Sequence, residues 1–376
     1  MSPDQSALLI DALLTAPRYT LPEILQQPLL WPVTLEIVRA ASQQMRLNKK
    51  LQGARVLLTG AGTSAYAANA VAAAWPQAIA VPTTDLLVDA ERYLTSIDAV
   101  ISLARSGSSP ESSAVVDQVR ALRPDIQQFA IVCDEDGALS RSSLDGLIVL
   151  DPRTNDQSLV MTSAFSNLVL AGLALAQPEA TVAAEKQLST RAGSLLRVID
   201  QACERAAARI RDRIVVLSSS PLLGWQREAG LKTLEMTAGR FPLLCETYLG
   251  LRHGPMSFVT PDTLVLCLLS SDPVRSKYEA DLIRELRAKR IGYLVGIADP
   301  AESLGLFDQL IPAVAPHLDD ALRTPFEILG PQLLGYHLSL MIGLNPDNPS
   351  PDGVINRVVS GVRIYPHHAF ETQGAI

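Results

Sequence analysis

Residues 54–66 read ARVLLTGAGTSAY, a short apolar run that ends in a glycine-rich turn and leads into an amphipathic segment. This pattern predicts a buried strand, a tight turn and a helix. Further apolar runs, separated by segments with helical spacing, predict strands at 79–84, 98–104, 128–134 and 146–151. Strands that alternate with helices predict an α/β fold with a parallel sheet covered on both faces.

The same alternation begins again in the second half of the chain. A charged, alanine-rich stretch from about residue 178 to about residue 210 predicts a long helix between the halves. The later apolar runs predict strands at 213–219, 264–271, 291–299 and 308–314. Two pairs of stretches are similar, namely 54–66 with 212–224 and 99–112 with 264–276. The chain therefore repeats one α/β unit.

The repeat divides the chain into four predicted parts. They are an N-terminal arm (1–30), a first domain (31–195), a second domain (196–345) and a C-terminal tail (346–376). The second copy lacks the glycines that follow the first strand of the first copy. We therefore expect the anion-binding site to belong mainly to the first half.

Composition excludes several classes of function. A net charge of −7 is unsuited to a general nucleic-acid binder, which needs a basic surface. No apolar run reaches the roughly 18–20 residues that span a membrane, and we expect no signal peptide at the start of the chain. The four cysteines are far apart and form no metal-binding cluster. We expect a cytoplasmic protein without nucleic-acid or membrane partners, and with no metal or cofactor.

The turn GAGTSA, residues 60–65, has two interpretations. It matches the dinucleotide fingerprint G-x-G-x-x-A, and Asp85 lies about 20–25 residues on, where that motif has an acidic residue. A plain strand-to-helix turn explains it equally well. The loop RSGSSPES, residues 105–112, favours a third interpretation, because it is rich in hydroxyls and also precedes a helix. Two such loops at the edge of a parallel sheet suit a phosphate monoester.

With these two loops, the sequence resembles the sugar isomerase (SIS) superfamily of phosphosugar-binding domains. The hallmarks are Gly62-Thr63-Ser64 and Ser106-Gly107-Ser108-Ser109. The resemblance implies two tandem SIS domains, each a flavodoxin-like, three-layer αβα unit. It also implies a phosphate site, which we predict to consist of Gly62, Thr63, Ser64, Arg105, Ser106 and Ser109. We further predict sugar contacts from Thr162 and Ser163.

A polar stripe follows in the second half. Glu228, Lys232 and Glu235 are spaced i, i+4 and i+7, which places them on one face of a helix. A solvated face with an ion pair is the simpler explanation. A loop, GLRHGPMSF (250–258), comes shortly afterwards and contains His253. A carboxylate stripe close to such a loop also fits a proton-transfer site.

These residues resemble the catalytic signature of double-SIS aldose–ketose isomerases, E-x-x-x-K-x-x-E followed by [KR]-H-G-P. The resemblance implies that Glu235 moves a proton between C1 and C2 of the open-chain sugar. It implies that His253 assists ring opening, as a residue donated by the neighbouring subunit of a homodimer with shared active sites. Lys232 and Glu228 would position the sugar and tune the base.

Within this superfamily the chain is most similar to the AgaS-type group of galactosamine-6-phosphate deaminase/isomerases, also called tagatose-6-phosphate ketose/aldose isomerases. The stretches 249–261, 278–287 and 345–365 carry this resemblance. Glucosamine-6-phosphate synthases bring a lysine into the sugar site from their C-terminal tail. No lysine follows Lys289 here, and Arg357 is a candidate substitute.

The resemblance implies an enzyme that converts an amino-sugar 6-phosphate, with galactosamine 6-phosphate favoured, into the ketose 6-phosphate with release of ammonia. Two alternatives stay open from the sequence. One is a deglycase that acts on adducts of amino acids with sugar 6-phosphates. The other is a non-catalytic protein that binds sugar phosphates.

Overall fold

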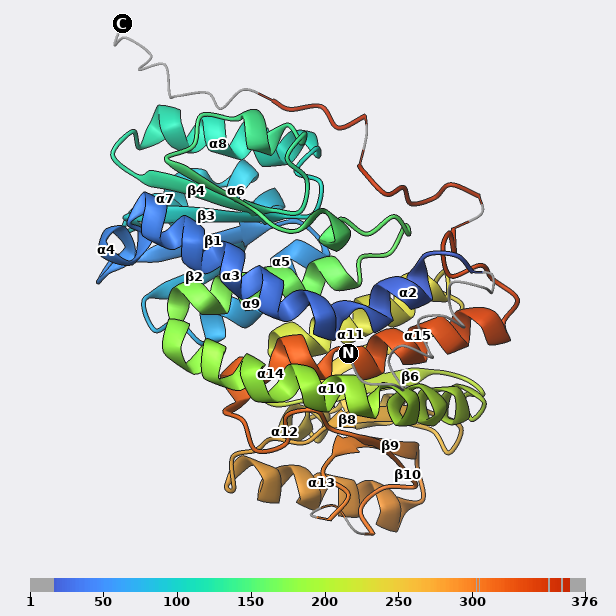
Figure 1. Ribbon diagram of the computed structural model, residues 1–376. Helices are drawn as coiled ribbons and strands as arrows, with labels where there is room; N and C mark the ends of the chain where they lie inside the picture. Colours follow the sequence, from blue (N-terminus) through green and yellow to red (C-terminus); the bar gives the residue numbers. More distant parts are fainter. Residues whose placement is uncertain (1–16, 302, 304, 351, 360, 366–376) are drawn as a thin grey trace, which may run out of the picture.

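The computed structural model describes residues 17–365, apart from residues 302, 304, 351 and 360. Each half of the chain contains a parallel five-stranded sheet, and a layer of helices lies between the two sheets (Figure 1). The prediction of an α/β fold with two similar units is confirmed.

The first sheet has the strand order β2-β1-β3-β4-β5. Its strands are β1 (Val56–Gly60), β2 (Ala78–Pro82), β3 (Ala99–Ala104), β4 (Gln127–Val132) and β5 (Gly146–Val149). All five predicted strands are present. The order reverses at β1, which pairs with β2 on one side and β3 on the other. Loops that leave β1 and β3 therefore flank the crevice where open α/β sheets bind their ligands.

The second sheet has the order β10-β9-β8-β6-β7. Its strands are β6 (Ile214–Ser218), β7 (Leu243–Thr247), β8 (Leu264–Leu268), β9 (Tyr293–Ala298) and β10 (Gln309–Pro312). The sequence predicted four of these and missed β7. This strand lies at the sheet edge and is only half buried, so it lacks the continuous apolar run of a central strand.

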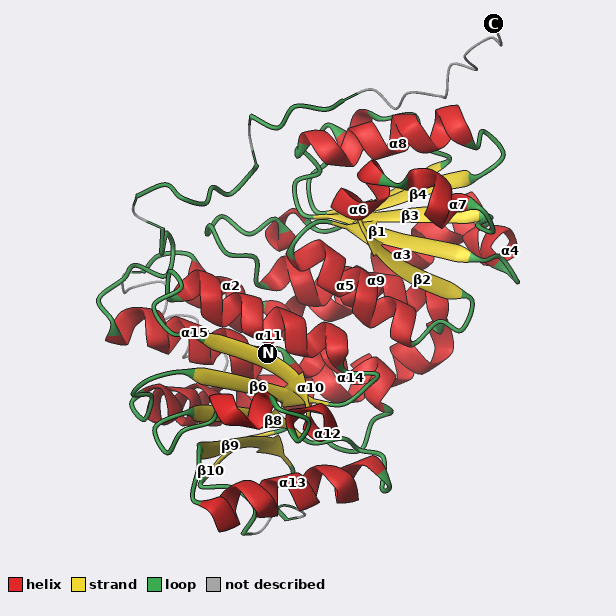
Figure 2. Ribbon diagram, turned by 180° about the vertical axis from the view of Figure 1, so that it is seen from behind, coloured by secondary structure: helices red, strands yellow, loops and turns green. Residues whose placement is uncertain are grey.

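The helices of the first half cover both faces of its sheet, and Figure 2 shows α6, α7 and α8 on the outer face. The helices are α2 (Thr20–Leu25), α3 (Gln27–Met45), α4 (Leu47–Leu51), α5 (Thr63–Ala73), α6 (Thr83–Val88), α7 (Ala90–Leu94), α8 (Pro110–Leu122) and α9 (Ser163–Ala176). Pro110 is the first residue of α8, where its missing N–H is not needed.

The second half contributes helices to the layer between the sheets as well as to its own outer face. They are α10 (Pro178–Ala207), α11 (Leu223–Met236), α12 (Tyr248–Leu251), α13 (Arg275–Lys289), α14 (Asp320–Glu327) and α15 (Leu329–Met341). Short 3₁₀ turns are η1 (Leu139–Arg141), η2 (Pro152–Thr154) and η3 (Pro255–Phe258). The predicted boundary between residues 195 and 196 lies inside α10.

One hydrophobic core joins the two halves. Trp31 of α3 meets Phe326 of α14 edge to face, with ring centroids 5.1 Å apart. Helix α11 of the second half packs against α5 of the first half and against α15. At the first of these crossings Gly224 is required, because a Cβ there would lie 2.7 Å from the backbone nitrogen of Ala70. This close approach brings the polar stripe of α11 to the first sheet.

The two terminal segments meet at Asp347. Its carboxylate accepts hydrogen bonds from the backbone N–H groups of Arg18, Tyr19 and Thr20, just before and at the start of α2. Residues 1–16 of the predicted arm and 366–376 of the predicted tail lie outside the described residues. Of the helices that the structure describes, none combines the length and the apolar character needed to cross a membrane.

Candidate active site

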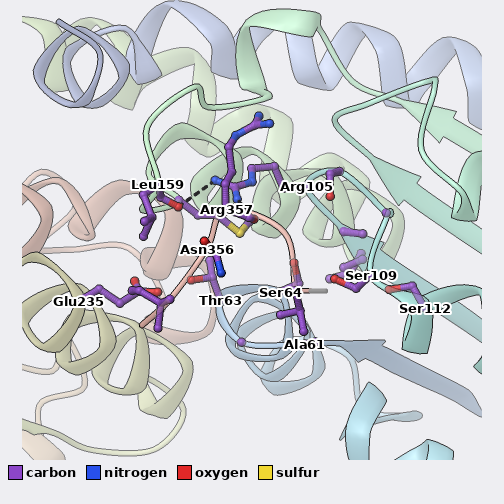
Figure 3. A pocket seen from close by; sticks show the side chains of 18 of the residues that line it. Ala61, Thr63, Ser64, Arg105, Ser109, Ser112, Leu159, Glu235, Asn356 and Arg357 are labelled. Carbon is purple, nitrogen blue, oxygen red and sulfur yellow. Dashed lines mark hydrogen bonds between the residues drawn. The ribbon is translucent and has the colours of Figure 1, made fainter. Parts of the chain in front are cut away.

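A cavity of about 420 Å³ lies at the carboxyl edge of the first sheet. Residues from both halves of the chain and from the C-terminal tail line it. Its walls are Ala61–Ser64, Leu103–Gly107, Ser109, Ser112, Leu159, Met161, Glu235, Val354–Arg357 and Val359. In Figure 3 Glu235 lies on one side of the cavity and Ser109 and Ser112 lie on the other, with Thr63 and Ser64 between them.

The first wall is the turn between β1 and α5. Gly62 has a φ of 56°, a left-handed conformation that favours glycine, and Thr63 begins the helix. Gly60 leaves room for the turn, because a Cβ there would lie 2.6 Å from the backbone of Ser64. Thr63 and Ser64 therefore stand at a helix N-terminus that faces the cavity, a setting that favours an anion.

The second wall is the loop between β3 and α8. Ser106 and Ser109 line the cavity as predicted from the sequence, and Ser112 joins them from the first turn of α8. The Ser109 hydroxyl makes no capping hydrogen bond to the helix. Sequence reasoning did not single out Ser112, although it is the last residue of the hydroxyl-rich stretch 105–112. Together the two walls contribute five serine or threonine residues to the lining of the cavity.

A second loop supports this wall from behind. Gly107 has a φ of 61°, and its carbonyl accepts a hydrogen bond from the backbone N–H of Leu139. A Cβ at Gly137 would lie 1.9 Å from the carbonyl oxygen of Ser106, so only glycine fits there. The loop 105–112, called the phosphate-type loop below, therefore requires a glycine at position 137. The local sequence does not reveal this requirement, because the two contacting residues are about 30 positions apart.

Arg105, predicted as a phosphate ligand, lines the cavity, but its guanidinium is bonded to the protein backbone. Its guanidinium is buried and donates hydrogen bonds to three backbone carbonyls, those of Ser158, Leu159 and Arg357. Burial lowers the pKa of Arg105 below its usual value. The side chain therefore ties segments of backbone together beside the cavity.

Thr162 and Ser163 also differ from their prediction as sugar contacts. Both are fully buried and neither lines the cavity. The carboxylate of Asp156 accepts hydrogen bonds from the backbone N–H groups of Thr162, Ser163 and Ala164, which are the otherwise unsatisfied donors at the start of α9. Thr162 and Ser163 therefore form part of the capped N-terminus of α9.

The stripe on α11 is the most constrained part of the site. The ammonium of Lys232 lies 2.7 Å from Glu235, 3.3 Å from Glu228 and 3.0 Å from the hydroxyl of Thr63. The side chains of Lys232 and Glu228 are completely buried, and that of Glu235 is 23% exposed. The solvated-face explanation is therefore wrong. Glu235 alone of the three reaches the cavity.

Burial and charge act in opposite directions on this cluster. Burial raises the pKa of Glu228 to about 7, although Lys232 acts to lower it. Burial lowers the pKa of Lys232, but Glu228 and Glu235 outweigh that effect and the net pKa is raised. Lys232 therefore stays protonated, while Glu228 is poised to exchange its proton near neutral pH.

The raised pKa of Glu228 predicts a pH-dependent stability. The folded state holds the proton up to about pH 7, whereas the unfolded chain releases it near the usual value of 4.5. The stabilisation from this proton is therefore lost as the pH rises through the folded pKa. We expect the melting temperature of the wild type to fall relative to that of Glu228→Gln between about pH 5 and about pH 8. A constant difference between the two melting curves would contradict this expectation.

His253 lies outside the cavity of its own chain. It follows α12, its side chain is exposed, and it is absent from the cavity walls. Neighbouring Leu249 is 44% exposed, a high value for a leucine. The sequence placed His253 on a loop, and this agrees with the structure. Its role in the active site of a neighbouring subunit remains a prediction.

The equivalent loop of the second half lines a separate cavity of about 610 Å³, but its serine hydroxyls are bonded to a carboxylate of the chain. Ser270 and Ser271 follow β8 as Arg105 and Ser106 follow β3. Both hydroxyls and the backbone N–H of Ser271 donate to the carboxylate of Asp320, which also pairs with Arg323. The Asp320 carboxylate thus accepts the hydrogen bonds that the hydroxyls of Ser270 and Ser271 could otherwise donate to a ligand.

Comparisons with known proteins identify the family. No protein-family model matches the chain. The D-galactosamine-6-phosphate deaminase AgaS of Shewanella sp. (strain ANA-3) is 35% identical, with 93% of this chain and 92% of the relative covered. The enzyme of the same name from Escherichia coli is 33% identical, with 93% and 96% covered.

A solved structure agrees with these relatives. The tagatose-6-phosphate ketose/aldose isomerase from Escherichia coli superposes with a TM-score of 0.82 at 30% identity, over 93% of this chain and 98% of that one. The chain belongs to the AgaS family. This confirms the resemblance stated from the sequence and makes the chain an enzyme of the phosphosugar deaminase/isomerase class. Membership of this enzyme family argues against the nicotinamide interpretation of the GAGTSA turn. It also argues against the interpretation of the chain as a non-catalytic binding protein.

Proposed function

We propose that this AgaS-family chain converts galactosamine 6-phosphate to the ketose 6-phosphate with release of ammonia. One observation carries the proposal. Among the described residues that line the cavity, Glu235 is the only carboxylate, and it lies across the cavity from the hydroxyls of the phosphate-type loop. This arrangement fits a substrate with a phosphate at one end and an acidic C–H bond at the other. The relatives named for this deamination support the choice of substrate.

The proposed chemistry begins with the open-chain sugar, which has an aldehyde at C1 and an amine at C2. The Glu235 carboxylate removes the proton from C2, and the electron pair moves toward the C1 oxygen. That oxygen takes a proton from the protonated C2 amine, which gives an enolamine. The same proton returns to C1, which leaves an imine at C2. Water then adds to the imine, and ammonia leaves with formation of the C2 ketone.

The remaining residues bind and orient. Thr63, Ser64, Ser106 and Ser109 would hold the phosphate with hydroxyls and helix N-termini. Lys232 does not line the cavity; it lies 2.7 Å from Glu235 and would orient that carboxylate. Glu228 would tune the cluster through its own proton. No step calls for a metal ion or an organic cofactor.

We further propose a cytoplasmic homodimer in which His253 serves the active site of the neighbouring subunit. The exposed position of His253, beside an exposed leucine and away from its own cavity, supports this arrangement. In that place the imidazole would assist opening of the pyranose ring by transferring a proton to the ring oxygen.

An ammonia-release assay tests the substrate. Galactosamine, glucosamine and N-acetylgalactosamine 6-phosphates are each supplied, together with an adduct of an amino acid with a sugar 6-phosphate, and the ketose product is identified. We expect ammonia and a ketose 6-phosphate from galactosamine 6-phosphate at the highest kcat/KM. Isomerisation without ammonia, or activity on the adduct alone, would overturn the proposal in favour of a simple isomerase or a deglycase.

A further inference from the structure

Arg105 connects the phosphate-type loop to the C-terminal tail. The residue directly precedes Ser106, and its side chain turns away from the loop toward two distant segments. Nη1 donates to the carbonyls of Ser158 (3.3 Å) and Leu159 (3.2 Å), and Nη2 donates to the carbonyl of Arg357 (2.5 Å). One buried cation thus joins three parts of the chain that meet at the cavity.

The tail reaches the same place with an arginine of its own. The guanidinium of Arg357 donates to the side-chain oxygen of Asn155 (2.7 Å) and to the carbonyl of Asp156 (2.6 Å). Arg357 lines the cavity, and its guanidinium is bonded to the segment before α9. Between the anchor at Asp347 and this one, residues Val354–Arg357 form a wall of the cavity.

Residues 155–159, which accept the hydrogen bonds of both arginines, are themselves bonded to the rest of the fold. The Asp156 carboxylate accepts from the backbone of Thr162 (2.7 Å) and Ala164 (2.9 Å) at the start of α9. The buried carboxylate of Glu23 accepts from the backbone N–H of Ser158 (3.2 Å). Arg105 and Arg357 therefore attach the tail to a rigid part of the fold.

We propose that Arg105 is a positioning residue that couples the phosphate-binding loop to the C-terminal tail, so that the wall facing the sugar is held in register with the phosphate. The inference rests on the proposed function, because it assumes a sugar phosphate in this cavity. The phosphate would be bound by the hydroxyl loops without direct help from Arg105. The sugar would gain affinity from a tail that Arg105 holds in place.

A double-mutant cycle separates this role from direct phosphate binding. The variants are Arg105→Met, a chain that ends at Gly353, and the combination of the two. The probes are inorganic phosphate and 2-amino-2-deoxygalactitol 6-phosphate, a reduced analogue that has no carbonyl and does not react. Dissociation constants are measured by calorimetry on the otherwise complete protein.

We expect Arg105→Met to weaken binding of the alditol phosphate about tenfold and to leave the affinity for inorganic phosphate within about twofold. The shortened chain should show a similar loss, and adding Arg105→Met to it should cost less than about a further twofold. An equal loss for both probes, or an undiminished effect in the shortened chain, would overturn the proposal and make Arg105 a phosphate ligand.

Two further variants provide an independent test of the coupling and a matched control. Arg357→Met should reproduce the selective loss for the alditol phosphate without altering any residue next to Ser106, so it tests the coupling even if Arg105→Met does not fold. Arg191→Met is the matched control, because Arg191 also donates to two backbone carbonyls, those of Ala313 and Val314, but away from the cavity. Failure of the wild type to bind the alditol phosphate while it still binds inorganic phosphate would instead contradict the proposed substrate.

Discussion

Turnover of the Glu235→Gln variant is expected to fall by about 100- to 10,000-fold, the usual contribution of one positioned general base. Glutamine has the shape of glutamate and can still accept a hydrogen bond from Lys232, but it cannot take a proton from C2 of the sugar. Glu235 is the only carboxylate on the cavity wall within the part of the chain that the structure describes. No other described wall residue can replace it as the base.

Binding should survive this substitution. Ser109 and Ser112 lie across the cavity from Glu235 (Figure 3), so the affinity for the alditol phosphate is expected to stay within about twofold of the wild-type value. Steady-state kinetics and calorimetry measure the two quantities separately. Glu36→Gln, an exposed change on α3, is the control and should leave both unchanged. Undiminished turnover of Glu235→Gln would remove Glu235 from the mechanism.

Local sequence patterns predicted the parts of the site that depend on neighbouring residues. The turn at Gly62 and the start of α8 at Pro110 follow from the backbone preferences of glycine and proline. The spacing of Glu228, Lys232 and Glu235 follows from the period of a helix. In each case the deciding interaction spans only a few residues, so the sequence carries it directly.

Other features depend on segments far apart in the chain, and local patterns could not reveal them. The burial of Lys232 results from the packing of α11 on α5, and the tie from Arg105 to Arg357 joins residues about 250 positions apart. Thr162 and Ser163 have the composition of a binding loop, yet Asp156 uses them to cap α9. Hydroxyl-rich stretches bind substrates or cap helices, and only the surrounding fold decides which.

The burial of Lys232 leads to the second large effect, on stability. Replacing Lys232 by methionine keeps an unbranched apolar chain of nearly the same length but leaves Glu228 buried without its cation. Breaking a buried pair in this way costs about 3–5 kcal/mol. The loss should grow from about pH 6 to about pH 8, because Glu228, whose pKa is already raised to about 7, escapes the penalty only while it is protonated. Thermal and urea unfolding at several pH values measure it.

The matched control is Lys289→Met on α13. Lys289 pairs with Glu285, but their side chains are 50% and 31% exposed, so this change should cost less than about 1 kcal/mol. The decisive comparison is the double variant Glu228→Gln/Lys232→Met. It removes the stranded charge together with the cation, and we expect it to be more stable at about pH 8 than Lys232→Met alone. If the double variant is no more stable, the cost lies in the packing of the lysine chain, and the charge balance of the cluster is not what holds α11 against α5.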